Sequence, residues 1–407
     1  MELFSNGSSN TCISNPSLEN LIMLPISRFG LPLLVLTQKK MHMNQSLHTN
    51  SKNVGQLTPP PISAKVRENY SSLDGLRAYA AVGIVLMHVQ ANLMIKPSDN
   101  ILTCNVIPWF TNFTLLFMII SAFSMCCGYY ERIKSGAITP AKFYTKRYHR
   151  VWPFFAMMVM ISFVMEPSWS TFCQSFADLT MCFNLLPNPN IEVIGVGWFL
   201  GTVFTFYMLF PFFTFLLDSK ERGWMVLLLS LVFCYIAIVY FGTPDFVVKP
   251  IDKVNIIYSA PFFVAGGMIY LYRQGIKNWV EKHWMIALAS CLVLTILRFV
   301  VDIKGVFILP DLLVFAAWLT YAIGSKDIVL NNGGGAKYLS GISMEIYLCH
   351  MMFFRVASML HLDKFIHNND MLYVATCIAT LIGAICFSHV IKYYVFTSIG
   401  NKYFKRH

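Results

Sequence analysis

Long apolar segments, separated by short polar stretches, follow one another along most of the chain. A helix needs about 20 apolar residues to cross a bilayer, and about ten segments from residue 73 onward are near that length. The segment 151–166 is short for a crossing, so its helix should begin among the basic residues before it. The pattern predicts an all-α, polytopic membrane protein with about ten transmembrane helices. We expect these helices near 73–95, 106–130, 151–166, 195–217, 224–242, 256–272, 284–301, 307–324, 338–358 and 371–396.

Composition and charge support a membrane protein and indicate its orientation. Of the 407 residues, 56% are hydrophobic and 13% are charged, whereas a soluble domain carries about 25% charged residues. The formal net charge is +11, and the basic residues collect in short loops without any nucleic-acid-binding motif. Outside the N-terminal tail, sixteen Lys and Arg residues fall on the side of the termini and five on the other. The positive-inside rule therefore predicts that both termini are cytoplasmic. We expect a multi-pass protein of the plasma (inner) membrane, whose partner is the lipid bilayer rather than nucleic acid.

The two ends of the chain differ in composition from the apolar middle. Residues 1–71 are polar and rich in Ser and Asn, so we expect a disordered cytoplasmic tail. Met41 and Met43 are alternative candidates for the start of translation. We expect one ten-helix membrane domain at 72–400, followed by a basic cytoplasmic tail at 401–407.

Two ionisable residues in the first apolar segment are the leading candidates for chemistry. Arg77 and His88 are eleven residues apart, so on a helix they lie on nearly the same face, about 16 Å apart along the axis. A guanidinium at the membrane surface suits a phosphate group, and a neutral imidazole deeper inside can take a proton from a hydroxyl. Asp74, one turn before Arg77, is favoured by the helix dipole and is also placed to orient Arg77. The alternative is that Arg77 extends to lipid headgroups while His88 bridges two helices.

A second basic cluster lies just before the third apolar segment. Arg147 and Arg150 are three residues apart, so on a helix they project within about 60° of each other. Lys142 and Lys146 flank them, and together these cations could hold a polyphosphate. The alternative is a basic anchor on the cytoplasmic side of the membrane.

Residues in the fourth and ninth apolar segments are candidates for a site that binds an acceptor substrate, or for the structural support of such a site. Trp198 is either a stacking platform for a sugar ring or part of an interfacial aromatic belt, and Tyr207 follows in the same segment. Ionisable residues in a bilayer are costly unless they are paired. Glu345 and His350 are about 140° apart on a helix and so do not share a face. At least one of them should therefore pair with another helix. No residue spacing indicates a metal site. The ninth segment contributes Ser343, Glu345, Tyr347 and His350.

Five motifs in order resemble those of the acyltransferase-3 family of integral membrane O-acyltransferases, over roughly 72–396. The most specific is LDGLRAYAAVGIVLMH (Leu73–His88), which is similar to the family's signature of an arginine and a histidine eleven residues apart. The other four are FYTKRYHRVWP, GWFLGTVFTFYMLFP, PFFVAGGMIYLY and LSGISMEIYLCH.

The resemblance implies a ten-helix enzyme that transfers an acyl group, usually acetyl, from cytosolic acyl-CoA. The acceptor would be a hydroxyl of a carbohydrate or lipid-linked glycan outside the cytoplasm, such as a surface polysaccharide. His88 aligns with the histidine implicated as the family's general base, and Arg77, Arg147 and Arg150 align with arginines of its motifs. Acyl-CoA is thereby implied as a co-substrate, and no permanently bound cofactor is implied.

Part of the family pattern is missing. Val203 and Phe204 stand where many members have a glutamate pair. The resemblance therefore does not identify the acceptor. A glycan or lipid transporter or exporter could use the same polar path without acyl transfer, although the sequence shows no internal repeat of the kind that many transporters have. A non-catalytic membrane sensor could use His88 as a pH switch.

Overall fold

All regular secondary structure in the described part of the chain is helical. The prediction of an all-α protein is confirmed for these residues, among which there is no strand. Of the predicted tails at 1–71 and 401–407, residues 1–69 and 401–407 lie outside the described part. The computed structural model describes residues 70–186, 193–241, 252–300, 308–325, 330 and 333–396.

The α-helices differ widely in length, and short π or 3-10 turns extend or connect several of them. The α-helices are α1 (Ser72–Asn92), α2 (Ile107–Trp109), α3 (Phe113–Met125), α4 (Glu131–Lys134), α5 (Pro140–Met165), α6 (Trp169–Thr180), α7 (Trp198–Leu216), α8 (Lys220–Ile236), α9 (Ile256–Lys282), α10 (Trp284–Val300), α11 (Leu309–Gly324), α12 (Gly333–Gly341), α13 (Ser343–Met359) and α14 (Asn369–His389). The short turns are η1 (Leu102–Val106), η2 (Phe110–Asn112), η3 (Cys126–Tyr130), η4 (Phe183–Leu185), η5 (Ala237–Phe241), η6 (Leu362–Lys364) and η7 (Val390–Phe396).

Several helical stretches are long and apolar enough to cross a membrane, which makes this a multi-pass membrane protein. Among the described residues there are six such stretches. Helices α9 and α10, which are bent by 103° at the short break between them, make a seventh if the pair counts as one span. The six are Ser72–Asn92, Leu102–Lys134, Pro140–Met165, Trp198–Leu216, Lys220–Phe241 and Asn369–Val395.

The predicted count of about ten spans and the cytoplasmic position of the termini are not confirmed. The apolar helix α11 is shorter than the length that a full crossing needs. The predicted span 338–358 is divided, because Ile342 separates α12 from α13. The predicted spans 284–301 and 307–324 border residues that lie outside the described part. Both predictions therefore stay predictions.

Local sequence signals explain where α5, the helix that carries Arg147 and Arg150, begins. The Thr139 side chain accepts a hydrogen bond from the backbone of Lys142, and Pro140 occupies the first turn, which are typical features of a helix N-terminus. The helix therefore starts among basic residues, as predicted for the short third segment. It continues through Pro153 to Met165 as one 26-residue element.

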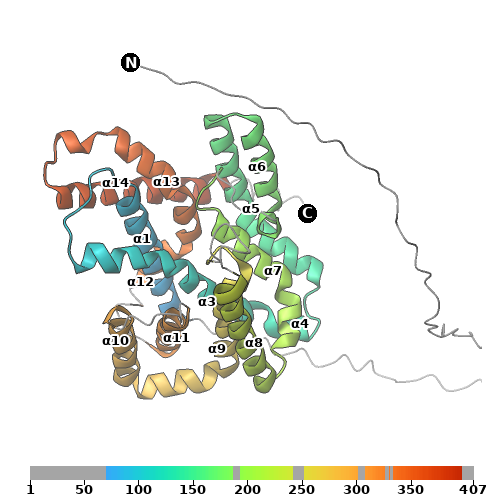
Figure 1. Ribbon diagram of the computed structural model, residues 1–407. Coiled ribbons are helices and arrows are strands. Elements are labelled where there is room, and N and C mark those ends of the chain that lie inside the picture. Colours follow the sequence, from blue (N-terminus) through green and yellow to red (C-terminus); the bar gives the residue numbers. More distant parts are fainter. Residues whose placement is uncertain are drawn as a thin grey trace, which may run out of the picture. The chain divides into compact units, whose positions relative to one another are not determined.

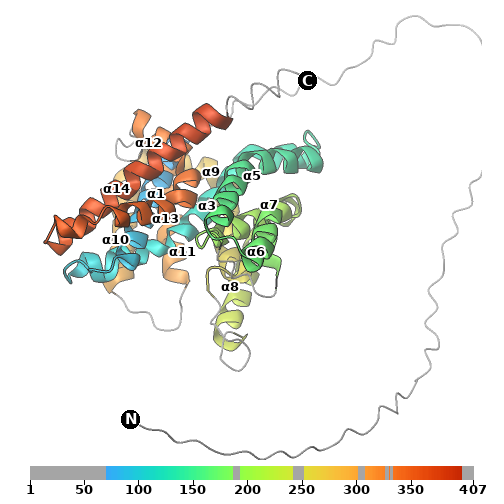
Figure 2. The same cartoon turned by 90° about the horizontal axis from the view of Figure 1, so that it is seen from above.

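The helix with the Arg77 and His88 pair lies inside the bundle. Helix α1 packs against α3, α11, α12, α13 and α14, and both ribbon views show it beside α13 and α14 (Figures 1 and 2). Of the six candidate spans, α1 and α7 are the most enclosed by protein and α8 is the least. Segments far apart in the sequence therefore meet around α1.

A close approach of two helices fixes one wall of this bundle. Helix α9 packs against α3, and a Cβ atom at Gly266 would lie only 2.2 Å from the backbone oxygen of Ile119. Backbone cannot move aside as a flexible side chain can, so this crossing needs a residue without a side chain. The position of α3, which carries one side of the site, therefore depends on glycine.

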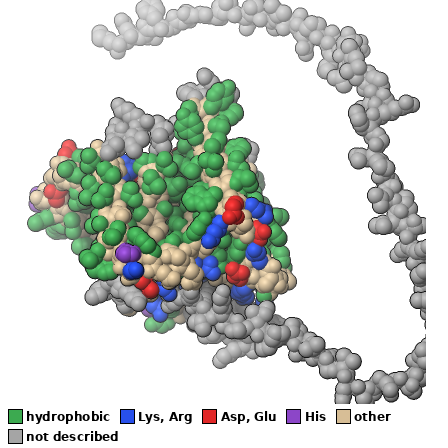
Figure 3. All heavy atoms as spheres, turned by 90° about the horizontal axis from the view of Figure 1, so that it is seen from below, with side chains coloured by type: hydrophobic (Ala, Val, Ile, Leu, Met, Phe, Trp, Pro, Cys, Tyr) green, Lys and Arg blue, Asp and Glu red, His purple; other side chains and the backbone are tan. Residues whose placement is uncertain are grey.

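Apolar side chains also cover much of the outer surface. Figure 3 shows hydrophobic side chains spread widely over one face, with basic and acidic side chains in a few smaller groups. Exposed apolar residues include Leu228 and Phe233 on α8 and Ile378 and Ile382 on α14. Continuous exposed apolar surface is unusual in soluble proteins and is what a lipid-facing surface requires.

Candidate functional site

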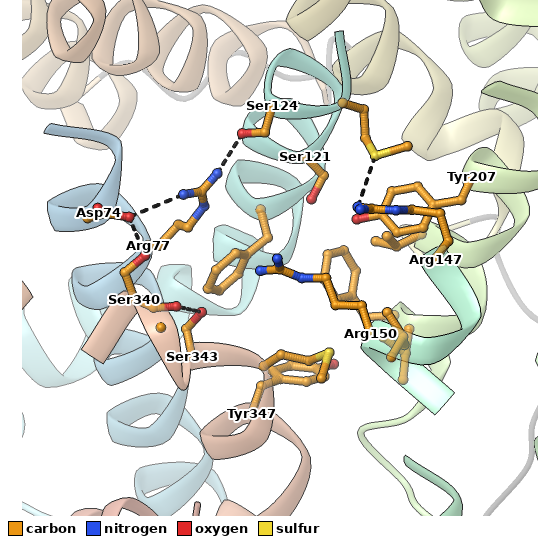
Figure 4. A pocket seen from close by; sticks show the side chains of 18 of the residues that line it. Asp74, Arg77, Ser121, Ser124, Arg147, Arg150, Tyr207, Ser340, Ser343 and Tyr347 are labelled. Carbon is orange, nitrogen blue, oxygen red and sulfur yellow. Dashed lines mark hydrogen bonds and ion pairs between the residues drawn. The ribbon is translucent and has the colours of Figure 1, made fainter. Parts of the chain in front are cut away.

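A cavity of about 730 Å³ opens between α1, α3, α5, α7, α12 and α13 (Figure 4). Its wall carries four cationic side chains and only one carboxylate. The lining residues are Asp74, Arg77, Phe117, Ser121, Ser124, Met125, Tyr129, Arg147, Arg150, Val151, Phe199, Leu200, Val203, Tyr207, Gly334, Lys337, Tyr338, Ser340, Gly341, Ser343, Met344, Tyr347 and Tyr393.

Arg77 is held on one side of the cavity by a hydrogen-bonded network. Its guanidinium pairs with Asp74 at 3.3 Å and donates to the Ser124 hydroxyl at 2.5 Å. Asp74 also accepts a hydrogen bond from Ser340 at 2.6 Å, so α1, α3 and α12 are tied together at this point (Figure 4). The carboxylate of the cavity is thus already paired, and Asp74 orients Arg77 as its spacing predicts.

Arg147 and Arg150 face the cavity from α5, but they differ in their partners. Arg147 donates to the Tyr129 hydroxyl at 2.6 Å and lies 4.7 Å from the centroid of that ring. Arg150 extends toward the middle of the cavity (Figure 4), close enough to Arg77 for the two positive charges to repel each other. No ion pair or hydrogen bond of Arg150 occurs within the described residues. The structure therefore gathers the three predicted arginines around one space.

Three further predicted residues line the same cavity. Tyr207 comes from α7, and Ser343 and Tyr347 come from the first turns of α13. The Ser343 hydroxyl donates to the backbone oxygen of Ser340 at 2.9 Å, which closes the break between α12 and α13. The buried Tyr347 donates to the backbone oxygen of Val196 at 2.5 Å. These bonds fix the side of the cavity opposite the arginines of α5.

His88 is not among the residues that line this cavity, and it lies beside His350. The two imidazole rings have centroids 4.9 Å apart and planes inclined by 51°. Nδ1 of His88 lies 3.0 Å from the backbone oxygen of Ile84. A carbonyl oxygen can only accept, so Nδ1 carries the hydrogen and Nε2 is left with the lone pair. His88 is thereby prepared to accept a proton at Nε2.

Tyr347 lies between the cavity and the histidine pair. It lines the cavity with Phe199, whose ring centroid is 5.7 Å from its own. The Tyr347 ring centroid is also 6.0 Å from that of His350. The arginine cavity and the histidine pair are therefore neighbouring parts of one region, with aromatic side chains between them.

Trp198 lies outside the cavity lining and carries a cation above its ring. Lys253 Nζ is 5.9 Å from the Trp198 ring centroid and donates to the backbone oxygen of Thr111 at 3.0 Å. Lys253 precedes α9, and burial lowers its pKa to about 8. Its charge also acts on His88. A role of Trp198 as a sugar platform stays a prediction.

Glu345 turns away from the cavity and pairs with a cation of η7. Lys392 Nζ lies 2.8 Å from its carboxylate and also donates to the backbone oxygen of Gly341. Glu345 thus pairs with one helix and His350 contacts another, as expected for residues that do not share a helix face. Lys392 thereby ties η7 to both sides of the break between α12 and α13.

Sequence reasoning missed several residues of this region. Tyr129 and Lys337 were hard to find, because an aromatic residue at a span end and a lysine in a short loop are ordinary features of membrane proteins. Lys392 could have been found, because a lysine within an apolar segment signals a partner inside the protein. Lys253 lies in a predicted loop, where a lysine by itself does not indicate a site.

Comparison with known proteins identifies the domain. The family model of acyltransferase-3, described as an acyltransferase domain, matches residues 70–389. This range contains every lining residue of the cavity except Tyr393. Neither the search of curated proteins nor the search of solved structures gave a match.

Proposed function

Because the chain belongs to the acyltransferase-3 family and is a membrane acyltransferase, we propose that it modifies an extracytoplasmic glycan such as a surface polysaccharide. The acyl group, with acetyl as the leading candidate, would come from cytosolic acyl-CoA and pass to a glycan hydroxyl. Under this proposal the protein lies in the plasma membrane with both termini in the cytoplasm.

The cationic cavity is the observation that carries the proposal. Its volume of about 730 Å³ is in the range of small-molecule and cofactor sites. Since Asp74 is already paired with Arg77, the charges of Arg147, Arg150 and Lys337 call for an anion from outside the protein. Guanidinium groups bind phosphate well because their donors match its oxygens in pairs. The phosphates of CoA supply such a multiply charged anion.

The spacing along α1 supports a path from the donor phosphates to the base. Arg77 and His88 are three turns apart on one helix, a distance of about 16 Å. The thin arm of CoA would extend from the arginines past Tyr347 and Phe199 toward the histidine pair. This arrangement brings the thioester to His88 while the phosphates stay at the mouth of the cavity.

His88 would act as the general base of the transfer. Nε2 takes the proton of the acceptor hydroxyl while the hydroxyl oxygen attacks the thioester carbonyl carbon. The carbon–sulfur bond then breaks, and the proton passes from His88 to the departing sulfur, which leaves as the CoA thiol. Such assistance typically accelerates a reaction by about 10²–10⁴-fold. Arg77, Arg147 and Arg150 hold the donor during this step.

Donor binding tests the cationic cavity directly. Arg150 has no partner in the described residues, so Arg150→Gln removes a phosphate contact without breaking an internal one. We expect the Kd for labelled acetyl-CoA on purified protein to rise about 10-fold or more, as for a lost charge-assisted hydrogen bond. Lys146→Gln is the matched control, because Lys146 is an exposed cation of α5 outside the cavity. Equal Kd values for wild type and Arg150→Gln would remove acyl-CoA from this cavity.

A further inference from the structure

His350 is a buried histidine with an unpaired nitrogen. Its side chain on α13 has 0% exposed surface. Nδ1 lies 2.7 Å from the backbone oxygen of Tyr347, so Nδ1 carries the hydrogen and Nε2 bears the lone pair. Nε2 is buried and has no hydrogen-bond partner among the described residues. Buried polar atoms in folded proteins are nearly always paired, so this atom needs an explanation.

The imidazole ring of His88 lies directly beside that of His350. The centroids are 4.9 Å apart, and the two residues come from α1 and α13, which pack against each other. Both histidines bond through Nδ1 to a carbonyl of their own helix. In the resting state both Nε2 atoms are therefore acceptors, and neither can donate to the other. The lone pair of His350 interacts favourably with His88 only when the His88 ring is positively charged.

We propose that His350 is a positioning residue for His88, with its Nε2 lone pair stabilising the positive charge of the His88 imidazolium formed during acyl transfer. The inference rests on the proposed function, because it takes His88 as the base. The proton on His88 comes from the acceptor hydroxyl and leaves with the CoA sulfur. His350 gains and loses no proton through the cycle; its lone pair only stabilises the charged form of its neighbour.

The surroundings favour a neutral partner over a carboxylate. The only acid on α13 is Glu345, and its carboxylate is paired with Lys392. Among the described residues, the charged side chain that acts on His88 is Lys253, which is a cation. A second imidazole can hold the His88 ring in place and stabilise its positive charge through a lone pair, without the cost of burying another charge.

The test compares two substitutions of His350 in an acyl-transfer assay. Full-length protein in native membrane vesicles receives labelled acetyl-CoA, and label in the glycan fraction is measured. His350→Phe keeps a ring but loses the nitrogen, and we expect kcat to fall about 10- to 100-fold with the KM for acetyl-CoA changed less than about twofold. His350→Gln supplies an acceptor oxygen and should be at least about threefold faster than His350→Phe.

Controls separate positioning from a general loss of structure. Cys349→Ala is matched, because Cys349 is the buried neighbour whose thiol faces Ser388 on α14 instead, and it should keep the wild-type rate. A second control compares the double variant His88→Ala/His350→Phe with His88→Ala alone. The two should transfer label at the same rate, since a positioning residue acts only through the residue that it positions.

Two results would overturn the inference. One is a wild-type kcat for His350→Phe, and the other is an equal loss for His350→Phe and His350→Gln. Failure of the proposed function looks different in the same assay: either the wild type transfers no label, or His88→Ala transfers it at the wild-type rate.

Discussion

At the scale of single residues, the cations of the cavity have distinct roles because they have different partners. Arg77 is fixed by Asp74 and Ser124, and Arg147 is fixed by Tyr129. Arg150 projects into the cavity without such a partner in the described residues (Figure 4). In our proposal, the two restrained guanidiniums give the donor phosphates a site that is already shaped, and the unrestrained Arg150 adjusts to them.

Asp178 on α6 gives a prediction about pH that does not depend on the function. Its side chain is buried, Oδ2 has no hydrogen-bond partner among the described residues, and burial raises its pKa from 3.8 to about 7. Between these two values the unfolded chain releases the proton while the folded chain keeps it. The free energy of unfolding therefore falls as pH rises from about 4 to about 7, and it stays low above that range.

The Asp178→Asn variant should remove this pH dependence. We expect it to be more stable than the wild type by about 2–4 kcal/mol near pH 8, with the difference shrinking toward zero near pH 4. Thermal unfolding of the purified protein across this pH range measures the difference. Asp363→Asn, at an exposed position of η6, serves as the control. A stability difference independent of pH would show that burial does not shift the pKa of Asp178.

The placement of the candidate residues was predictable from the sequence where spacing along one helix determined it. The eleven-residue spacing of Arg77 and His88 and the three-residue spacing of Arg147 and Arg150 are properties of single helices, and both pairs fall within continuous helices. Contacts between distant segments, such as Tyr129 with Arg147 or His88 with His350, were not predictable, because they depend on how the helices pack.

At the scale of helices, a break and a close approach shape the site. Because the helix is interrupted at Ile342, between α12 and α13, residues of α12 and of the first turns of α13 both line the cavity. Hydropathy alone predicted one span there, although Gly341, the last residue of α12, is a glycine and glycine is common at helix ends. The ion pair of Glu345 and Lys392 and the bond of Lys392 to Gly341 stabilise the break from η7.

The crossing of α3 and α9 can be tested with two glycines of the same helix. Gly266→Ala should destabilise the protein by about 1–3 kcal/mol, because the new methyl group meets the backbone of Ile119. Gly275→Ala, also on α9 but with no atom within 4 Å of the added Cβ, should be neutral or slightly stabilising. Thermal unfolding in detergent gives both values. Similar effects of the two substitutions would contradict the close approach.

At the scale of the whole molecule, segments from both halves of the sequence converge on α1. Composition predicted a helical membrane protein correctly, because apolar length and low charge are global properties of the chain. The number of spans was harder to predict, since it depends on bends and short helices such as α9–α10 and α11, which packing against other helices determines. The site needs this convergence, because α3, α5, α7, α12 and α13 each supply part of the cavity around α1.

This convergence relates the cationic cavity to the histidine pair along one helix. In our proposal the cavity receives the donor phosphates and the histidine pair receives the thioester and the acceptor hydroxyl. The aromatic side chains of Tyr347 and Phe199 separate the two parts. Acyl transfer, as opposed to transport of a glycan, requires a reaction at the histidine end while the donor stays bound at the arginine end.

The most direct test measures the flow of label from acetyl-CoA to glycan in vesicles that contain the wild type or His88→Ala. We expect the wild type to label the glycan and His88→Ala to be at least about 100-fold slower, because the base is lost. Acetyl-CoA binding should be unchanged in the variant, since the arginines remain. Label transfer by His88→Ala at the wild-type rate, or movement of glycan across the membrane without any label, would contradict this account.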